Sequence, residues 1–244
     1  MIEDYARCPK DVCRKSLTDS RHRRTRTSIL VKKGGKTLLA DVSADFREQA
    51  LRHRVREIDA ALISHGHIDH FGGLPDIRSY TKQGPLAVYA SAETIRNVKS
   101  VFSYMFDSGG DCGGGIPCLQ MIELCGVSEV AGFTVTPVPV THGKIKGCLG
   151  FRIDNIAYVP DVKFIDPEHE KLLVGLDCLI LNCLRDHREH NTHMILSQSM
   201  ELARRLAPGR CYFIHMGHEI DYAVDSKKLD SWMEFSYDGL VVNV

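Results

Sequence analysis

Residues 61–74, ALISHGHIDHFGGL, place three histidines and an aspartate within six positions: His65, His67, Asp69 and His70. Imidazole nitrogens and carboxylate oxygens are ligands that divalent metal ions accept readily. His65 and His67 are two residues apart, so an extended segment points both rings to the same side. The cluster follows the apolar run ALIS directly, and a rigid scaffold often presents its chemistry at a strand end. The sequence therefore predicts a metal site here.

Four candidate ligands within six residues cannot all close on one ion, and two ions need ligands from elsewhere. Three later residues each come just after an apolar strand: His142 after VTPVPVT, Asp161 after IAYVP and His215 after CYFI. A single histidine at a strand end is more often structural. Three residues that share this position indicate further ligands for a pair of ions.

The composition limits the class of protein. A chain of 244 residues is by default one large domain and buries a core without disulfides. Its 31 basic and 31 acidic residues balance, so no net field attracts nucleic acid or an anionic membrane. No apolar stretch is long enough to span a bilayer, and MIEDYARC lacks a signal-peptide pattern, so we expect a cytoplasmic protein. In that compartment the nine cysteines are expected to be mostly buried thiols or metal ligands.

The elements that must position these ligands alternate between strands and helices. Apolar runs flanking Gly34-Gly35 predict a β-hairpin, because glycine accepts positive φ. Further strands are predicted over 58–64, 85–91, 133–143, 148–153, 155–161, 177–183, 210–218 and 237–244, and helices over 45–55, 73–84, 92–102 and 197–207. The strands form two sets with helices between them. This pattern favours two sheets packed face to face and covered by helices over the alternative, a single doubly wound sheet.

Residues 107–118, DSGGDCGGGIPC, contain five glycines. Glycine is conformationally costly to order, so a purely structural connection would rarely use so many. We therefore expect a flap that closes over substrate.

SHGHIDH, together with His142, Asp161 and His215, resembles the metallo-β-lactamase superfamily of dinuclear metallohydrolases over nearly the whole chain. DVSADFREQ, GGGIP and the NTH segment at 191–193 further resemble the subgroup of the phosphoribosyl cyclic phosphate phosphodiesterase of phosphonate breakdown. The resemblance implies an α/β fold: one domain over 1–244, an αββα sandwich of two mixed sheets with helices outside. Members of the family begin with a strand for which the residues before Cys8 leave no room. We therefore expect this first strand to be missing, and an unpaired sheet edge allows a homodimer.

The resemblance also implies roles for the ligands. It assigns His65, His67 and His142 to one ion, Asp69, His70 and His215 to the second, and Asp161 to a bridging position. The ions would be Zn²⁺, Mn²⁺ or Fe²⁺, and a hydroxide that bridges them would be the nucleophile. Asp41 would support the histidine loop from behind.

Asp69 and His193 are the residues to which the resemblance gives a catalytic role. His193 would donate a proton to the leaving group, since an imidazole with an unperturbed pKa near 6.5 suits that task. On the same loop, His190 is a candidate for substrate contact and His187 is interpreted as a surface residue.

A second metal site is implied near the N-terminus. The resemblance predicts a structural zinc held by Cys8, Cys13 and His218, where the family has a third cysteine. That third position falls on Lys10, so Asp11 or another residue would have to complete a tetrahedral set. The alternative is a pair of thiols that binds no metal.

These observations predict a metal-dependent phosphodiesterase that acts on a small cyclic or nucleotide-like phosphodiester. The first alternative is an RNA endonuclease of the tRNA 3′-end type, which uses an inserted arm that this sequence lacks. The second is a thioester or lactone hydrolase, and the third is a non-catalytic metal-binding scaffold, against which the seven intact ligands argue. The basic segment RHRRTRT at 21–27 is interpreted as a solvated loop, and we expect neither a nucleic acid nor a membrane partner.

Overall fold

The computed structural model describes residues 8, 10–106 and 115–244. The chain forms two compact units. Unit 1 comprises Met1–Thr25, Val138–Lys144 and Gly150–Val244, and unit 2 comprises Arg26–Pro137 and Ile145–Leu149. Neither unit is one continuous stretch, because the chain passes between them several times. A single domain over 1–244 stays a prediction.

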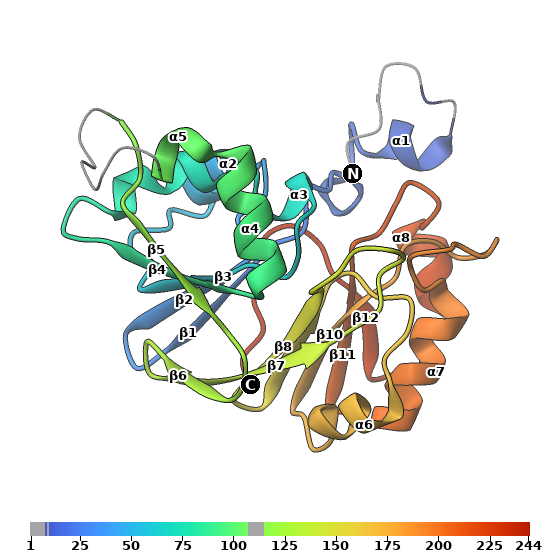
Figure 1. The fold of residues 1–244 in the computed structure, drawn as a ribbon. Helices are drawn as coiled ribbons and strands as arrows, with labels where there is room; N and C mark the ends of the chain where they lie inside the picture. The colour runs from blue at the N-terminus through green and yellow to red at the C-terminus, as the bar shows by residue number, and fades with distance from the viewer. Residues whose placement is uncertain (1–7, 9, 107–114) are drawn as a thin grey trace. The chain divides into compact units, whose positions relative to one another are not determined.

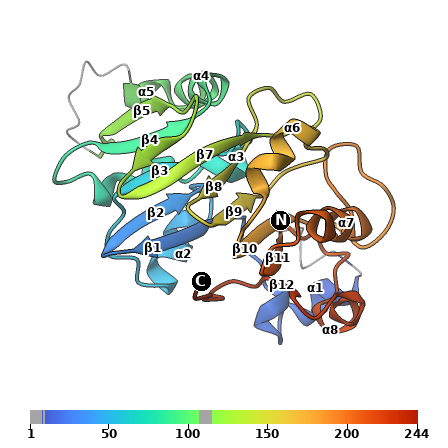
Figure 2. The same cartoon turned by 90° about the horizontal axis from the view of Figure 1, so that it is seen from below.

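Unit 2 is built on a five-stranded sheet whose strands lie side by side in the order β1-β2-β3-β4-β5 (Figure 2). The strands are β1 (Ile29–Lys33), β2 (Lys36–Ala40), β3 (Ala60–Leu62), β4 (Leu86–Ala90) and β5 (Leu119–Glu123). The first pair is antiparallel and the other pairs are parallel, so the sheet is mixed. Gly34 and Gly35 have φ angles of +56° and +78° in the hairpin turn, which explains why glycines are needed there. A second antiparallel hairpin joins β6 (Ser128–Val130) to β7 (Phe133–Pro139).

Helices cover one face of this sheet (Figure 1). They are α2 (Phe46–Arg52), α3 (Ile68–Phe71), the 3-10 helix η2 (Leu74–Tyr80), α4 (Ala92–Val101) and α5 (Ser103–Phe106). Phe46, Val98 and Met105 of these helices pack in one core with the strand residues Leu39 and Val88. The predicted helix over 73–84 is a 3-10 helix instead, and it ends well before Gly84. Pro75 lies in its first turn, where the missing backbone N–H would have no partner within a helix.

Gly73 follows the histidine loop where two backbone segments of unit 2 come close together. A Cβ atom on Gly73 would lie 2.1 Å from the Ser43 carbonyl oxygen and 2.7 Å from Phe46 Cβ. We expect Gly73→Ala to lower the free energy of unfolding by about 1–3 kcal/mol, because the backbone must shift to relieve the clash. Gly126→Ala is the control, since its Cβ would meet nothing within 4 Å. Urea unfolding of the two variants measures the difference, and equal stabilities would contradict the close approach.

Unit 1 contains a second mixed sheet with strands in the order β12-β11-β10-β9-β8. They are β8 (Leu149–Ile153), β9 (Ile156–Val159), β10 (Cys178–Asn182), β11 (Arg210–Ile214) and β12 (Met233–Phe235). Only β8 and β9 pair antiparallel within this set. The helices are α1 (Asp11–Lys15), η1 (Ser20–His22), α6 (Pro167–Glu170), η3 (Lys171–Leu173), α7 (Leu196–Leu206), α8 (Tyr222–Asp225) and η4 (Ser226–Lys228). Helix α7 lies along the sheet (Figure 1), and its Leu202 and Leu206 join Leu179 and Phe213 in the core of this unit.

The α/β class with two mixed sheets is confirmed. The strand predicted over 237–244 is wrong: the last strand is β12, and Gly239 takes a φ of +89° in a turn beyond it. Val241 and Val244 are 82% and 62% exposed, so their β propensity meets no neighbouring strand. The expectation that the family's first strand is missing concerns residues 1–7, and most of the predicted glycine-rich flap is residues 107–114. Both stretches lie outside the described residues. In the part of the chain that the structure describes, no helix has the length and apolar character needed to cross a bilayer.

Candidate metal centre

In unit 2 the histidine loop begins where β3 ends, next to the end of β2. Asp41 follows β2 and has a φ of +60°, a left-handed conformation that residues other than glycine seldom adopt. Its backbone N–H donates to the Leu62 carbonyl at 2.8 Å, and its side chain is fully buried. Such backbone outliers concentrate at functional sites, where the surrounding structure holds them in place. Here the unusual backbone places a carboxylate beneath the histidine loop.

Asp41 fixes which nitrogen of two histidines carries the hydrogen. One of its oxygens lies 2.7 Å from Nδ1 of His70, so Nδ1–H donates and Nε2 keeps its lone pair. The Ser64 hydroxyl donates to the same carboxylate at 2.9 Å, which leaves its oxygen to accept from Nδ1 of His65 at 3.0 Å. The Ser64 backbone N–H donates to the other oxygen at 2.8 Å. His65 and His70 therefore both present an Nε2 lone pair, as a metal-binding imidazole must.

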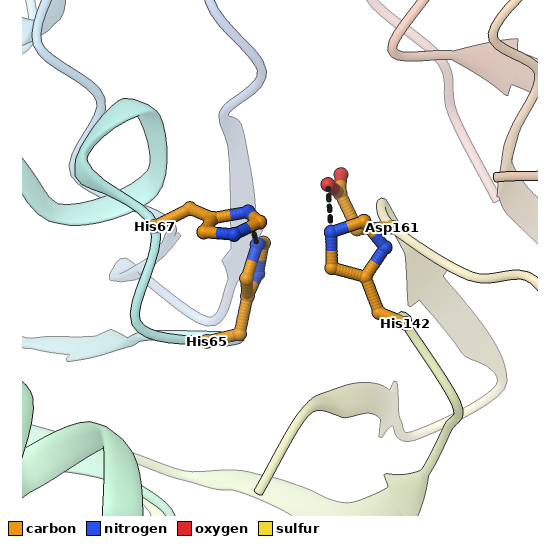
Figure 3. Close-up of side chains that lie close together, drawn as sticks. All are labelled: His65, His67, His142 and Asp161. Carbon is orange, nitrogen blue, oxygen red and sulfur yellow. Dashed lines mark hydrogen bonds and ion pairs between the residues drawn. The ribbon is translucent and has the colours of Figure 1, made fainter. Parts of the chain in front are cut away.

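The other two candidate metal ligands of this loop, His67 and Asp69, lie close to the Nε2 atoms of His65 and His70. Nε2 of His65 is 2.9 Å from Nδ1 of His67, and Figure 3 shows the two rings turned toward each other. His67 is the residue before α3, and Asp69 and His70 lie within that helix. Asp69 Oδ2 is 3.6 Å from Nε2 of His70. Helix α3 thus holds the side chains of Asp69 and His70 close together, and the extended segment before it does the same for His65 and His67.

Asp41→Asn tests this arrangement. The amide can donate to Nδ1 of His70, which would move the ring hydrogen to Nε2 and remove a metal ligand. We expect divalent-metal affinity to fall about 10–100-fold. Competition with a chromophoric chelator measures the affinity, and circular dichroism checks the fold. Asp76→Asn, an exposed aspartate of η2, is the control; equal affinities in both variants would refute the role of Asp41.

In unit 1, Asp161 lies between two histidines. Its Oδ2 is 3.4 Å from Nε2 of His142, and its Oδ1 is 3.1 Å from Nε2 of His215. Figure 3 shows Asp161 beside the His142 ring. Nδ1 of His142 lies 2.8 Å from the Thr192 carbonyl and must donate to it, so Nε2 has the lone pair. His215 follows β11 and has a φ of +60°, the same strand-end conformation as Asp41.

His193 belongs to the same group in unit 1. Its ring stacks on His215 with centroids 4.9 Å apart, and its Nε2 is 3.9 Å from Asp161 Oδ2. Asn182 at the end of β10 accepts from the Met194 N–H and donates through Nδ2 to Nδ1 of His193 at 3.3 Å. The Nε2 of His193 therefore carries the hydrogen and faces the carboxylate.

Burial lowers the pKa of His193 to about 3, although Asp161 opposes the shift. The pKa of His193 therefore lies below the ordinary imidazole value expected from the sequence. The ring is neutral at neutral pH, with Nε2–H as its donor. A nearby anion would favour the protonated ring, because negative charge stabilises the imidazolium.

The other two histidines of the loop that carries His193, His190 and His187, have different surroundings. His190 lies near the site, with ring centroids 5.1 Å from His193, and burial lowers its pKa. Its Nδ1 accepts from the Thr192 N–H at 3.3 Å. His187 has a side chain that is 79% exposed and lies beside Asp186. His187 is thus a surface residue, as interpreted from the sequence, and substrate contact by His190 stays a prediction.

Each unit thus supplies donors that suit divalent ions. Unit 2 supplies His65, His67, Asp69 and His70, and unit 1 supplies His142, Asp161 and His215, with His193 beside them. Three of the imidazoles have a hydrogen-bond acceptor behind Nδ1, which is the usual support for a metal-binding histidine. A third set, Cys8, Cys13 and His218, also comes together in unit 1, with ligand atoms within 4.8 Å of one another. A structural zinc at that set stays a prediction.

Sequence reasoning missed three supporting residues: Ser64, Asn182 and Thr192. Ser64 and Asn182 are buried polar residues at the ends of apolar strands, the same signal that identified His142, Asp161 and His215. Thr192 acts through its backbone carbonyl, for which no residue type is a signal.

A family model and a solved structure each match most of this chain. A family model described as a beta-lactamase superfamily domain matches residues 36–216. Among solved structures, a diphosphatase of the PhnP family is similar with a TM-score of 0.88 and 33% identity, over 98% of this chain and 91% of that chain.

Two curated proteins are similar in sequence. An octanoyltransferase from Porphyromonas gingivalis is 32% identical over 236 residues, which is 93% of this chain and 47% of that protein. A ribonuclease Z from Bradyrhizobium sp. is 29% identical over 129 residues, which is 50% of this chain and 42% of that protein. The chain thus spans about half the length of the first of these curated relatives and matches the second over a smaller share.

Proposed function

The chain belongs to the beta-lactamase superfamily, as its metallo-β-lactamase resemblance predicted, and from this premise we propose a dinuclear metal-dependent hydrolase of phosphorus–oxygen bonds. Its substrate would be a small phosphodiester, cyclic or nucleotide-like, or a related diphosphate. The observation that carries the proposal is Asp161, whose two oxygens lie beside two different histidines of unit 1. A carboxylate in that position can serve two ions at once.

We assign the ligands as the family resemblance implies. His65, His67 and His142 would hold one ion, and Asp69, His70 and His215 the other, with Asp161 shared between them. Divalent ions bound there would supply charge stabilisation for phosphoryl oxygens and make hydroxide available near neutral pH. Zinc and manganese are the first metals to test, followed by iron, because nitrogen and carboxylate donors suit all three.

The chain's own residues would orient the substrate and move a proton. Nε2 of His193 has the hydrogen, and Asn182 holds the ring by its other nitrogen. An anionic phosphate beside this ring would favour the imidazolium, so the proton donor would be charged with substrate present. His193 would then give this proton to the leaving alkoxide, since phosphoryl transfer otherwise needs mainly positioning and charge stabilisation.

One relative supports this reaction class. The diphosphatase, matched over 91% of its chain, is named for cleavage of a phosphorus–oxygen bond. The octanoyltransferase and the ribonuclease Z are each matched over less than half of their length, so their names carry no activity to this chain. The balanced charge of the chain favours a small substrate over RNA.

A substrate panel tests the proposal. The protein is reconstituted with Zn²⁺ or Mn²⁺ and assayed with bis(p-nitrophenyl) phosphate, a cyclic phosphodiester, a diphosphate, a tRNA precursor and a thioester. We expect metal-dependent turnover of one or more of the small phosphorus substrates. Turnover of RNA or thioester alone would favour one of the other hydrolases, and no turnover despite bound metal would favour a scaffold.

Two further expectations remain predictions. A cytoplasmic location is one of them. The homodimer rests on a sheet edge attributed to residues outside the described part of the chain.

A further inference from the structure

Two thiols meet one imidazole near the start of the described chain. Sγ of Cys8 lies 3.4 Å from Nδ1 of His218, and Sγ of Cys13 lies 3.6 Å from the same nitrogen. The two sulfurs are within 4.8 Å of each other and are not joined in a disulfide. Cys13 is on α1 and His218 is on the loop after β11, all within unit 1.

Lys10 determines what this group can do. Its Nζ lies 2.7 Å from Nε2 of His218 and donates at 3.0 Å to Oε1 of Glu219. An ammonium has donors and no acceptor, so Nε2 of His218 must accept. The ring hydrogen is then on Nδ1, pointing at the two sulfurs.

This hydrogen disfavours zinc at the site. A zinc ligand must offer a lone pair, and Nδ1 would have to lose its hydrogen to Nε2. Nε2–H would then face the Lys10 ammonium at 2.7 Å, with a donor on both sides. Glu219 accepts from the same ammonium at 3.0 Å and holds it beside Nε2. Two sulfurs and one imidazole blocked in this way do not fit a tetrahedral structural zinc.

We propose that Cys8 and Cys13 form a redox-active dithiol that closes to a disulfide, in place of a structural zinc. Cys8 is partly exposed and meets the oxidant first, while Cys13 is 3% exposed and acts as the resolving thiol. Closing the disulfide brings the two sulfurs from within 4.8 Å of each other to bonding distance. Nδ1–H of His218 is in place to stabilise negative charge that develops on either sulfur during exchange.

The oxidant is a low-molecular-weight disulfide such as oxidised glutathione. The Cys8 thiolate attacks one glutathione sulfur, the glutathione S–S bond breaks, and one glutathione thiolate leaves. The Cys13 thiolate then attacks the Cys8 sulfur of this mixed disulfide and releases the second glutathione. Two electrons pass from the two cysteines to glutathione disulfide, and the two protons that they lose are taken up by the released thiolates.

Thiol mapping tests the proposal on the metal-loaded protein. After equilibration with excess oxidised glutathione, trypsin cleavage at Arg7, Lys10 and Arg14 separates CPK from DVCR. We expect these peptides to be joined, with a loss of two hydrogen atoms. Cys8→Ser should instead give no internal disulfide, and Cys13→Ser should stop at the mixed disulfide of Cys8. Thiols that stay unmodified in the wild-type protein would overturn the proposal.

Zinc content provides the second measurement. Wild-type protein and the Cys8→Ser/Cys13→Ser variant should bind the same number of zinc ions per chain. Lys10→Cys, which removes the ammonium and adds a sulfur, should bind one additional zinc per chain and resist oxidation. Extra zinc in the wild-type protein relative to the double variant would show that the site is a zinc site after all.

Discussion

Replacing Asp161 with asparagine is expected to abolish tight binding of both active-site metals and to lower kcat/KM about 10³-fold or more, equivalent to about 4 kcal/mol of lost transition-state stabilisation. Asp161 is 4% exposed, and each of its oxygens lies within 3.4 Å of a different histidine nitrogen. An amide of the same shape has one neutral oxygen and one N–H donor. One of the two sides therefore loses its acceptor, and both lose the negative charge.

Elemental analysis after dialysis measures metal per chain, and steady-state kinetics on a phosphodiester measures activity. Asp166→Asn is the matched control, because Asp166 is an exposed aspartate of the same unit. Circular dichroism must show that both variants keep their fold. Two metals retained per chain in Asp161→Asn would refute the bridging role, and with it the main support for the proposed function.

Replacing His193 with alanine is expected to leave metal content unchanged and to lower kcat about 10²–10⁴-fold for a substrate with a poor leaving group. Nε2 of His193 is 3.9 Å from Asp161 Oδ2, so the ring lies beside the proposed metal ligands, where it would reach a substrate held by the metals. A p-nitrophenolate leaves without a proton, so the loss with bis(p-nitrophenyl) phosphate should be much smaller. The comparison of the two substrates isolates proton donation from metal binding.

His187→Ala is the control for this experiment, because His187 lies on the same loop and its side chain is exposed. His70→Ala should instead harm both substrates together, since it removes a proposed metal ligand. An equal loss with good and poor leaving groups in His193→Ala would contradict the general-acid role. His193 would then be a residue that positions substrate or supports the histidines packed against it.

The candidate metal-binding residues and their places at strand ends could be recognised in the sequence. Strands and helices depend largely on local patterns, and a polar residue that ends an apolar run is visible without a structure. His65, His142, Asp161 and His215 all occupy such positions, and β3, β7, β9 and β11 precede them as expected. Where the local signal was incomplete the prediction failed, as with Val241, whose β propensity has no partner strand to pair with.

Which ring nitrogen of each candidate ligand carries the hydrogen was decided only by the tertiary structure. Asp41 reaches Ser64 across 23 residues, Thr192 reaches His142 across 50, and Lys10 reaches His218 across 208. These contacts exist because particular strand ends and loops become neighbours in the fold, and sequence spacing does not encode that. They decide which ring nitrogen carries the hydrogen. They therefore decide whether an imidazole can bind a metal, as at His70, or faces two thiols with a donor, as at His218.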